Sequence, residues 1–377
     1  MEAAEARSVE QTRGRMHVGY SVTFQNPHGA RSDAEVYHRE LGFALQAEMW
    51  GFDSIWTVEH HFTEYTMCPD PLQLLTYLAG QTRRIQLGTG VIVLPWHDPI
   101  RLAEQITLLD NLSGGRVLLG IGRGIAKVEY DGFRVPMDTS RERFIEYASV
   151  LLRGLEDGHV EHEGTFVSQP RRELRPRPQH SFRGRTYAAA VSPDSMPIMA
   201  ALGVGLLVIV QKPWEMVRED FVAYRAAWAE VNDDEPPPPI CSGFLFVDED
   251  ADRAEELAHE YIGEYYRSVL RHYAFDQAPH EGITGYEFYA SIARYIDRHG
   301  TDGAVKDFIA LMPWGTPEQV LEKLEVIRDT IGMAGFTPNF CYGAMPYEEA
   351  ERNIACFVDQ VLPTLKEWEA PPIGLSV

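Results

Sequence analysis

Positive charge is scarce in this sequence. Its 377 residues contain 34 lysines and arginines but 56 aspartates and glutamates, which gives a formal net charge of −22. A surface with this excess of negative charge repels both a phosphate backbone and the anionic headgroups of a membrane. The sequence therefore predicts no nucleic-acid partner and no membrane partner.

Cysteine and long apolar runs are scarce as well. Cys68, Cys241, Cys341 and Cys356 are far apart and lack the C-x-x-C or Cys/His spacing of a zinc site. They predict reduced thiols in a cytoplasmic protein, without a metal site. No segment reaches the roughly 18 apolar residues that a membrane span needs. Residues 1–15 are polar, lack the apolar core of a signal peptide, and are predicted to be a flexible tail.

From Met16 onward, short apolar strands alternate with amphipathic helices. Eight strands, each followed by a helix, are the count of a (β/α)8 TIM barrel, and we predict one domain over residues 16–377. The predicted strands are 17–24, 54–57, 85–94, 116–121, 186–190, 206–210, 240–247 and 336–342. The predicted helices lie around 34–50, 71–82, 99–112, 139–157, 195–203, 214–231, 250–273, 316–332 and 346–367.

Two stretches are longer than a minimal barrel requires. Residues 158–184 begin with a Gly-bounded polar segment and continue with many arginines and prolines, which predicts a small hairpin and an extended loop. Residues 274–314 carry many aromatics between the helix after the seventh strand and the last helices. Long insertions on a barrel usually form a lid or an interface. The composition of this second insertion is compatible with either role.

The densest set of titratable groups follows the second predicted strand, where Glu59, His60 and His61 are consecutive. Functional groups of α/β barrels collect in the loops after the strands, and histidine titrates near neutral pH. A solvated or structural histidine pair remains the alternative.

Two other loops at the same end have the residues of an anion site. Ser192 followed by Pro193 predicts a helix start, whose unpaired backbone N–H groups attract a phosphate. Arg123, between Gly122 and Gly124, offers a bidentate guanidinium to the same group. A plain capped helix and a structural ion pair are the alternatives.

Several segments together resemble the bacterial luciferase family of flavin-dependent monooxygenases, from Met16 to about Trp368. The segments that carry the resemblance are 59–64, 85–95, 108–116, 120–124, 315–318 and 361–363. The resemblance implies a barrel that binds reduced FMN delivered by a separate reductase and reacts it with O2 at flavin C4a. The resulting (hydro)peroxide would then oxidise a small organic substrate, hydrophobic or carbonyl-bearing. A homodimer is also expected, with helix 71–82 either at the interface or facing the barrel.

The family's functional positions can be matched one by one. His60 matches the acid or base beside the flavin, with Glu59 and His61 as its support. Ser192, Ser195 and Arg123 match positions around the FMN phosphate. The remaining matched positions are Gly90 and Val91 as a cis peptide under the flavin ring, Gly122 beside the flavin, Trp96 and His97 in the substrate pocket, and Tyr286 and Phe288 in the active-site lid that the resemblance implies for residues 274–314.

The sequence also departs from luciferase. Gly122 replaces a reactive cysteine, Val191 replaces a glutamate, and Trp96 and His97 replace smaller residues. A long-chain aldehyde substrate and light emission are therefore not expected from the resemblance. A deazaflavin-dependent hydride transfer, or a flavin-binding or partner subunit without catalysis, are the other functions that such a sequence allows.

Overall fold

Parallel strands close into a barrel in the computed structural model, which describes residues 14–190, 192–277 and 279–374. The strand order is β4-β3-β2-β14-β11-β10-β9-β6-β5, and a further pairing of β4 with β6 closes the ring. The predicted (β/α)8 TIM barrel is confirmed. Its strands are β2 (His17–Val22), β3 (Ser54–Thr57), β4 (Gln86–Thr89), β5 (Ile92–Val93), β6 (Val117–Gly122), β9 (Thr186–Ala189), β10 (Gly205–Ile209), β11 (Ile240–Phe244) and β14 (Gly335–Asn339).

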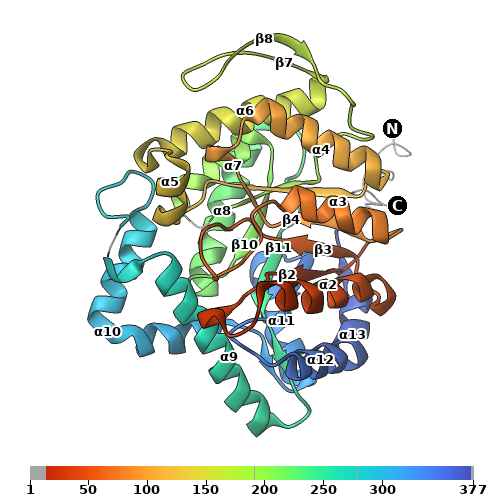
Figure 1. Ribbon diagram of the computed structural model, residues 1–377, viewed down its shortest axis with the longest axis vertical. Coiled ribbons are helices and arrows are strands. Elements are labelled where there is room, and N and C mark those ends of the chain that lie inside the picture. Colours follow the sequence, from red (N-terminus) through yellow and green to blue (C-terminus); the bar gives the residue numbers. More distant parts are fainter. Residues whose placement is uncertain (1–13, 191, 278, 375–377) are drawn as a thin grey trace, which may run out of the picture.

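Helices surround the barrel in the order that the sequence predicted (Figure 1). Two helices were not predicted, α5 (Lys127–Phe133) and α10 (Glu287–Leu311), and α10 contains a non-helical kink at Gly300. The predicted helix 346–367 is α12 (Tyr347–Cys356), a π-helical turn (Phe357–Val361) and α13 (Leu362–Glu367). The others are α2 (Asp33–Trp50), α3 (Pro71–Gln81), α4 (Pro99–Ser113), α6 (Ser140–Asp157), α7 (Met196–Leu202), α8 (Trp214–Val231), α9 (Ala251–His272) and α11 (Pro317–Ile331).

The barrel interior is filled by side chains. Trp56, Leu118, Tyr187 and Leu207 are at most 2% exposed and form one apolar cluster inside the ring. Gly88 makes room for the indole, because a Cβ there would lie 2.3 Å from the Trp56 ring. The barrel is therefore a packed core and not a pore, so ligands must bind at its ends.

Two predicted strands are each divided into two shorter strands. The predicted strand 85–94 is interrupted between β4 and β5, where the peptide bond between Gly90 and Val91 is cis and Gly90 N–H donates to the carbonyl of Thr57 at 2.7 Å. The predicted strand 240–247 is also divided, because β12 (Phe246–Val247) pairs with β13 (Trp314–Gly315) outside the barrel. After the first interruption the chain rejoins the barrel sheet as β5, whereas β12 lies in a separate two-stranded sheet.

The first insertion forms the predicted hairpin. β7 (His159–Glu163) and β8 (Ser168–Glu173) pair antiparallel and project from the barrel at the top of Figure 1. The second insertion contains α10, which packs against α9. This arrangement places the second insertion, and not the hairpin, beside the C-terminal ends of the strands.

The chain ends meet at the opposite end of the barrel. β1 (Gly14–Arg15) pairs antiparallel with β15 (Glu369–Ala370), and Ala370 and Ile373 join the apolar cluster of the interior. The predicted tail 1–15 is therefore wrong for Gly14 and Arg15, while residues 1–13 lie outside the described part. No helix in the described part of the chain is long and apolar enough to cross a membrane.

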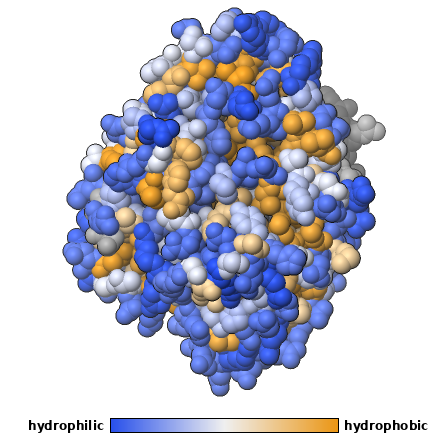
Figure 2. Space-filling model, viewed as in Figure 1, coloured by the Kyte–Doolittle hydropathy of each residue, from blue (hydrophilic) through white to orange (hydrophobic). Residues whose placement is uncertain are grey.

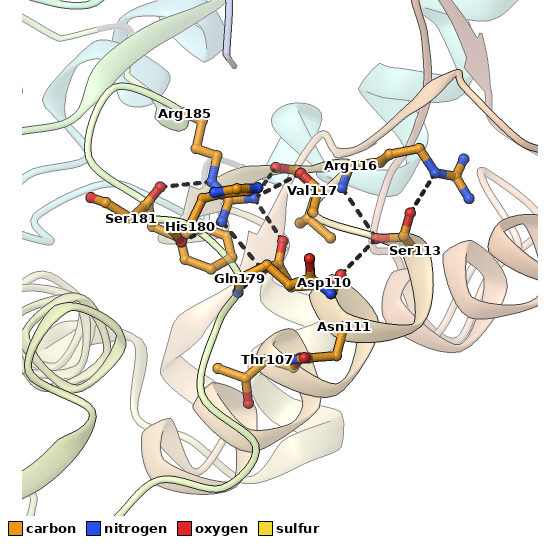
Figure 3. Close-up of polar contacts among 12 residues, drawn as sticks. Thr107, Asp110, Asn111, Ser113, Arg116, Val117, Gln179, His180, Ser181 and Arg185 are labelled. Carbon is orange, nitrogen blue, oxygen red and sulfur yellow. Dashed lines mark hydrogen bonds and ion pairs between the residues drawn. The ribbon is translucent and has the colours of Figure 1, made fainter. Parts of the chain in front are cut away.

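A network of ion pairs and hydrogen bonds lies at this same end of the barrel. It includes Asp110, Ser113 and Arg116 from the segment 108–116, one of the segments that resemble the luciferase family. Arg185 directly precedes β9, is 1% exposed, and forms two contacts with the buried carboxylate of Asp110, at 2.7 and 3.4 Å. Figure 3 shows Asp110 also accepting from the backbone N–H of Gln179, and nearby Arg116 bonded to Ser113. These contacts stabilise the barrel. They lie at the N-terminal ends of the strands, whereas ligands of such barrels bind at the C-terminal ends.

Candidate active site

Two adjoining clefts open at the C-terminal ends of the barrel strands. The first cleft holds about 1,020 Å³ of empty space and runs from Glu59 to Ser192 and Ser195. The second cleft holds about 860 Å³ and lies between the barrel, α9 and the second insertion. The residues common to both clefts are Val58, His60, Gly90, Ile209, Gln211 and Tyr273.

His60 lies at the junction of the two clefts. Its Nδ1 is 2.9 Å from the buried carboxylate of Glu129, and its Nε2 is 3.5 Å from the hydroxyl of Tyr273. The same Glu129 oxygen accepts the backbone N–H of His61 at 2.9 Å and lies 3.4 Å from Nε2 of His272. Burial alone would raise the pKa of Glu129, but the two histidines hold it well below its usual range. Glu129 is therefore an ionised acceptor that directs Nε2 of His60 toward the clefts.

Glu59 anchors the loop that carries His60. It is 2% exposed and accepts hydrogen bonds from Trp96 and His97, both at 2.7 Å, from His61 at 3.1 Å, and from the backbone N–H of Val93. Burial opposes ionisation, yet the hydrogen bonds from His61 and His97 lower the pKa of Glu59 to about 2. Glu59 is thus a permanently charged structural centre and not a proton donor near neutral pH.

Trp96 and His97 do not line the two clefts, although the sequence predicted them in the substrate pocket. Both side chains bond to Glu59 and border a separate surface depression with Asp70 and Asp98, instead of lining either cleft. His61 likewise turns toward Glu59 and packs edge-on against Phe133, with ring centroids 4.6 Å apart. Of the histidines predicted at this rim, His60 is the one that lines the two clefts.

The peptide bond between Gly90 and Val91 is cis; Gly90 lines both clefts, and Val91 lines the first. Val91 packs against Gly122, where an added Cβ would lie 2.5 Å from the Val91 side chain. A cysteine at position 122 would therefore clash unless Val91 moved. Glycine at position 122 therefore leaves the space that the Val91 side chain occupies.

The first cleft is also lined by donors suited to an anion. Arg123 Nη1 and Arg141 Nη2 are buried and have no hydrogen-bond partner among the described residues. Ser192 and Ser195 lie beside them, with their hydroxyl oxygens 2.8 Å apart. Asp194 lies next to these donors, with its carboxylate 4.0 Å from Arg141, but its side chain is 67% exposed. One unpaired nitrogen on each of two guanidinium groups, together with two hydroxyls, fits a phosphate such as that of FMN. Val191, the other predicted difference near the phosphate, lies outside the described residues.

The second insertion is tied to the loop after β6. Arg123 Nη2 donates to the carbonyl of Gly285, and the guanidinium stacks 3.9 Å above the ring of Tyr286. The Tyr286 hydroxyl donates to the carbonyl of Gly124 at 2.9 Å, and His280 bonds to the carbonyl of Ile125. Tyr286 is completely buried, whereas Phe288 is partly exposed and packs at the rim of the core. The predicted lid residues thus hold the insertion in place and do not line the clefts.

Three site residues were missed from the sequence. Glu129 and Arg141 sit in the first turns of α5 and α6, and His272 ends α9, so neither spacing nor a local motif linked them to Glu59-His60-His61. A sequence signal existed for Arg141 alone, as a basic residue where a predicted helix begins near the rim. His60, Glu129 and His272 also offer ligand atoms within 4.8 Å of one another, a spacing that a metal ion would accept.

The fold is a closed parallel barrel, and the first cleft at its C-terminal end is lined by His60 and by two arginines with unpaired donor atoms. A family model of luciferase-like monooxygenases matches residues 16–333, and this chain belongs to that family. It is 26% identical over 358 residues to an alkanal monooxygenase alpha chain from the Kryptophanaron alfredi symbiont, covering 92% of this chain and 98% of that one. It is 27% identical over 246 residues to the oxygenase component of a flavin-dependent trigonelline monooxygenase from Acinetobacter baylyi, covering 63% and 68%. The crystal structure of monooxygenase RslO1 from Streptomyces bottropensis superposes with a TM-score of 0.77 at 26% identity, covering 93% of this chain and 99% of RslO1. The protein is accordingly a flavin-dependent monooxygenase.

Proposed function

We propose that this chain is the oxygenase component of a two-component monooxygenase that uses reduced FMN and O2. In the overall reaction, substrate, FMNH2 and O2 yield the oxygenated substrate, FMN and water. The observation that carries the proposal is the pair of buried, unpaired donor atoms on Arg123 and Arg141 in the cleft that His60 also lines. The likeness to an oxygenase component supports a separate reductase as the source of the reduced flavin.

The residues of the chain have distinct roles in this proposal. Arg123, Arg141, Ser192 and Ser195 would hold the FMN phosphate through their guanidinium and hydroxyl groups. Reduced FMN supplies the electrons that activate O2. His60 holds or moves a proton at Nε2, the ring nitrogen that faces the clefts, because Nδ1 is engaged by Glu129.

The second insertion serves as the lid in this proposal. Exclusion of water protects reactive oxygen intermediates and strengthens electrostatic interactions in the site. Residues 274–314 cover the second cleft with Phe275, Phe308 and Met312 and are fixed to the β6–α5 loop through Tyr286. Gly285 and Gly300 have positive φ values, 87° and 76°, at two bends of this segment.

A homodimer through α2, α3 and α4 is also part of the proposal. Leu72, Leu75 and Leu78 on α3 face the barrel core and are buried, so the predicted apolar stripe is not the interface. Large hydrophobic side chains are nevertheless exposed on the outer faces of these helices (Figure 2). They are Met49, Tyr77, Leu108 and Leu112. Light scattering of the purified chain should give twice the chain mass, and Tyr77→Glu should shift it to the monomer.

The function is tested by mixing the purified protein with reduced FMN and air-saturated buffer. We expect an intermediate that absorbs in the near ultraviolet, and product when a substrate is present. His60→Ala should retain FMN binding and lose product formation. Normal turnover by His60→Ala would remove this histidine from the mechanism. Anaerobic turnover with a reduced deazaflavin, and none with FMNH2, would assign hydride transfer instead.

A further inference from the structure

The second cleft differs in chemistry from the first. Tyrosine and phenylalanine rings dominate its wall, among them Tyr65, Phe244, Tyr265, Tyr266 and Phe308. Four of these rings form two stacked pairs. Phe244 stacks on Tyr265, and Tyr266 stacks on Phe308 with ring centroids 4.2 Å apart. Rings held in this way offer faces and edges to a further planar ring.

Fixed charge is absent from this cleft among the described residues that line it. The arginines and carboxylates that line the first cleft have no counterpart there, and His60 at the junction is its one imidazole. The tyrosine hydroxyls stay protonated, since burial raises the pKa of Tyr65 to about 12. A charged ligand would lose its hydration without gaining a counter-ion, so the cleft favours a neutral molecule.

Two buried polar atoms of this cleft have no hydrogen-bond partner in the described part of the chain. Oγ1 of Thr66 and Oδ1 of Asn339 lack a hydrogen bond, although these residues are only 2% and 4% exposed. The Asn339 amide donates through Nδ2 to the carbonyl of Gly243, which leaves Oδ1 as an acceptor. Buried polar groups are normally paired, so each atom marks a place where a ligand group belongs. An acceptor at Asn339 requires an O–H or N–H donor from the ligand.

We infer that the second cleft binds the organic substrate, and that this substrate is a neutral aromatic molecule with a hydroxyl or N–H group that bonds to Asn339 and Thr66. This inference rests on the proposed function only for the word substrate, since the cleft can be probed without flavin or oxygen. The bound ring would reach the junction at His60 and Gly90, where the two clefts meet.

The experiment measures binding of 2-naphthol by calorimetry and compares it with three matched probes. Naphthalene lacks the hydroxyl, decahydro-2-naphthol lacks the aromatic rings, and 2-naphthoate carries a charge. We expect 2-naphthol to bind about fivefold more tightly than naphthalene or decahydro-2-naphthol. Binding is assigned to the second cleft by Val269→Phe, which fills part of the cleft from α9 and should weaken 2-naphthol at least tenfold.

The polar contacts are tested by Asn339→Leu and Thr66→Val. Each should weaken 2-naphthol about fivefold and leave naphthalene unchanged or slightly tighter, because the lost acceptor matters only to the hydroxyl. A variant that failed to fold would lose both probes and reduced FMN, so the naphthalene and FMN measurements identify that case. In that case the effect of Val269→Phe on 2-naphthol affinity decides whether the second cleft is the binding site.

Three results would overturn the inference. In the first, Val269→Phe does not weaken 2-naphthol binding. In the second, decahydro-2-naphthol binds as tightly as 2-naphthol. In the third, 2-naphthoate binds as tightly as 2-naphthol and its binding is weakened by Val269→Phe. Reduced FMN is titrated in parallel against the same preparations. Failure of FMN binding with intact 2-naphthol binding would reject the proposed function alone, and the reverse pattern would reject this inference alone.

Discussion

Replacement of Arg141 by glutamine is the sharpest test of how the first cleft recognises its cofactor. The Arg141 side chain is 18% exposed, and its buried Nη2 has no partner among the described residues. A hydrogen bond from a charged donor contributes about 1.5–3 kcal/mol, and 1.4 kcal/mol is about tenfold in affinity. Partial exposure favours the lower part of this range, so Arg141→Gln should weaken reduced FMN about 10- to 50-fold.

Reduced riboflavin provides the matched ligand, since it has the same ring system and no phosphate. Anaerobic titration should show that Arg141→Gln changes riboflavin affinity by less than twofold. Arg143→Gln is the matched variant. Arg143 lies two residues further along α6, stacks over Phe166 and donates to Tyr147, without lining the first cleft.

The nearby carboxylate gives a second control. Asp194 is largely exposed and 4.0 Å from Arg141, so this ion pair contributes about 1 kcal/mol or less. Asp194→Asn should therefore change FMN affinity by no more than about fivefold. Arg141 does not recognise the phosphate if Arg141→Gln changes FMN affinity by less than twofold, or if it weakens riboflavin binding as much as FMN binding.

Four further predictions follow from other contacts. Glu129→Gln removes the charge beside Nδ1 of His60 and should lower kcat about 10- to 100-fold with little change in FMN affinity, and unchanged pH dependence of kcat would contradict this role. Asp110→Asn leaves Arg185 buried without a counter-ion and should cost about 3–5 kcal/mol in unfolding free energy by urea titration, while FMN affinity in the folded protein stays within twofold. Glu59 has a folded pKa of about 2, below its unfolded value, so it contributes about 3 kcal/mol of stability above pH 4.5 that is lost as the pH falls toward 2; Glu59→Gln should remove that part of the acid dependence, and identical acid-unfolding curves would argue against it. Dialysis against EDTA should leave activity unchanged, because hydrogen bonds already engage the shared Glu129 oxygen, and loss of activity that Fe²⁺ or Zn²⁺ restores would establish a metal at His60, Glu129 and His272.

The barrel was predictable because each of its parts has a local signal. A short apolar strand must be buried on both faces, and the helix that follows must carry one apolar stripe, so their alternation is visible along the chain. The interruption at Gly90–Val91 and the extra helices α5 and α10 were less visible. Tertiary contacts decide them, such as the bond from Gly90 to Thr57 and the packing of α10 on α9.

The sequence by itself determined the barrel and the family, and it placed His60, Arg123, Ser192 and Ser195 at one end of the strands. This was possible because each of these residues follows a strand, and all parallel strands of a barrel end on the same side. Only the tertiary structure decided which neighbours complete the site. Glu129, Arg141 and His272 come from helices distant in sequence, and Trp96 and His97 turn toward Glu59 because a buried carboxylate needs several donors. The direction of a loop side chain depends on such contacts, which no local pattern in the chain encodes.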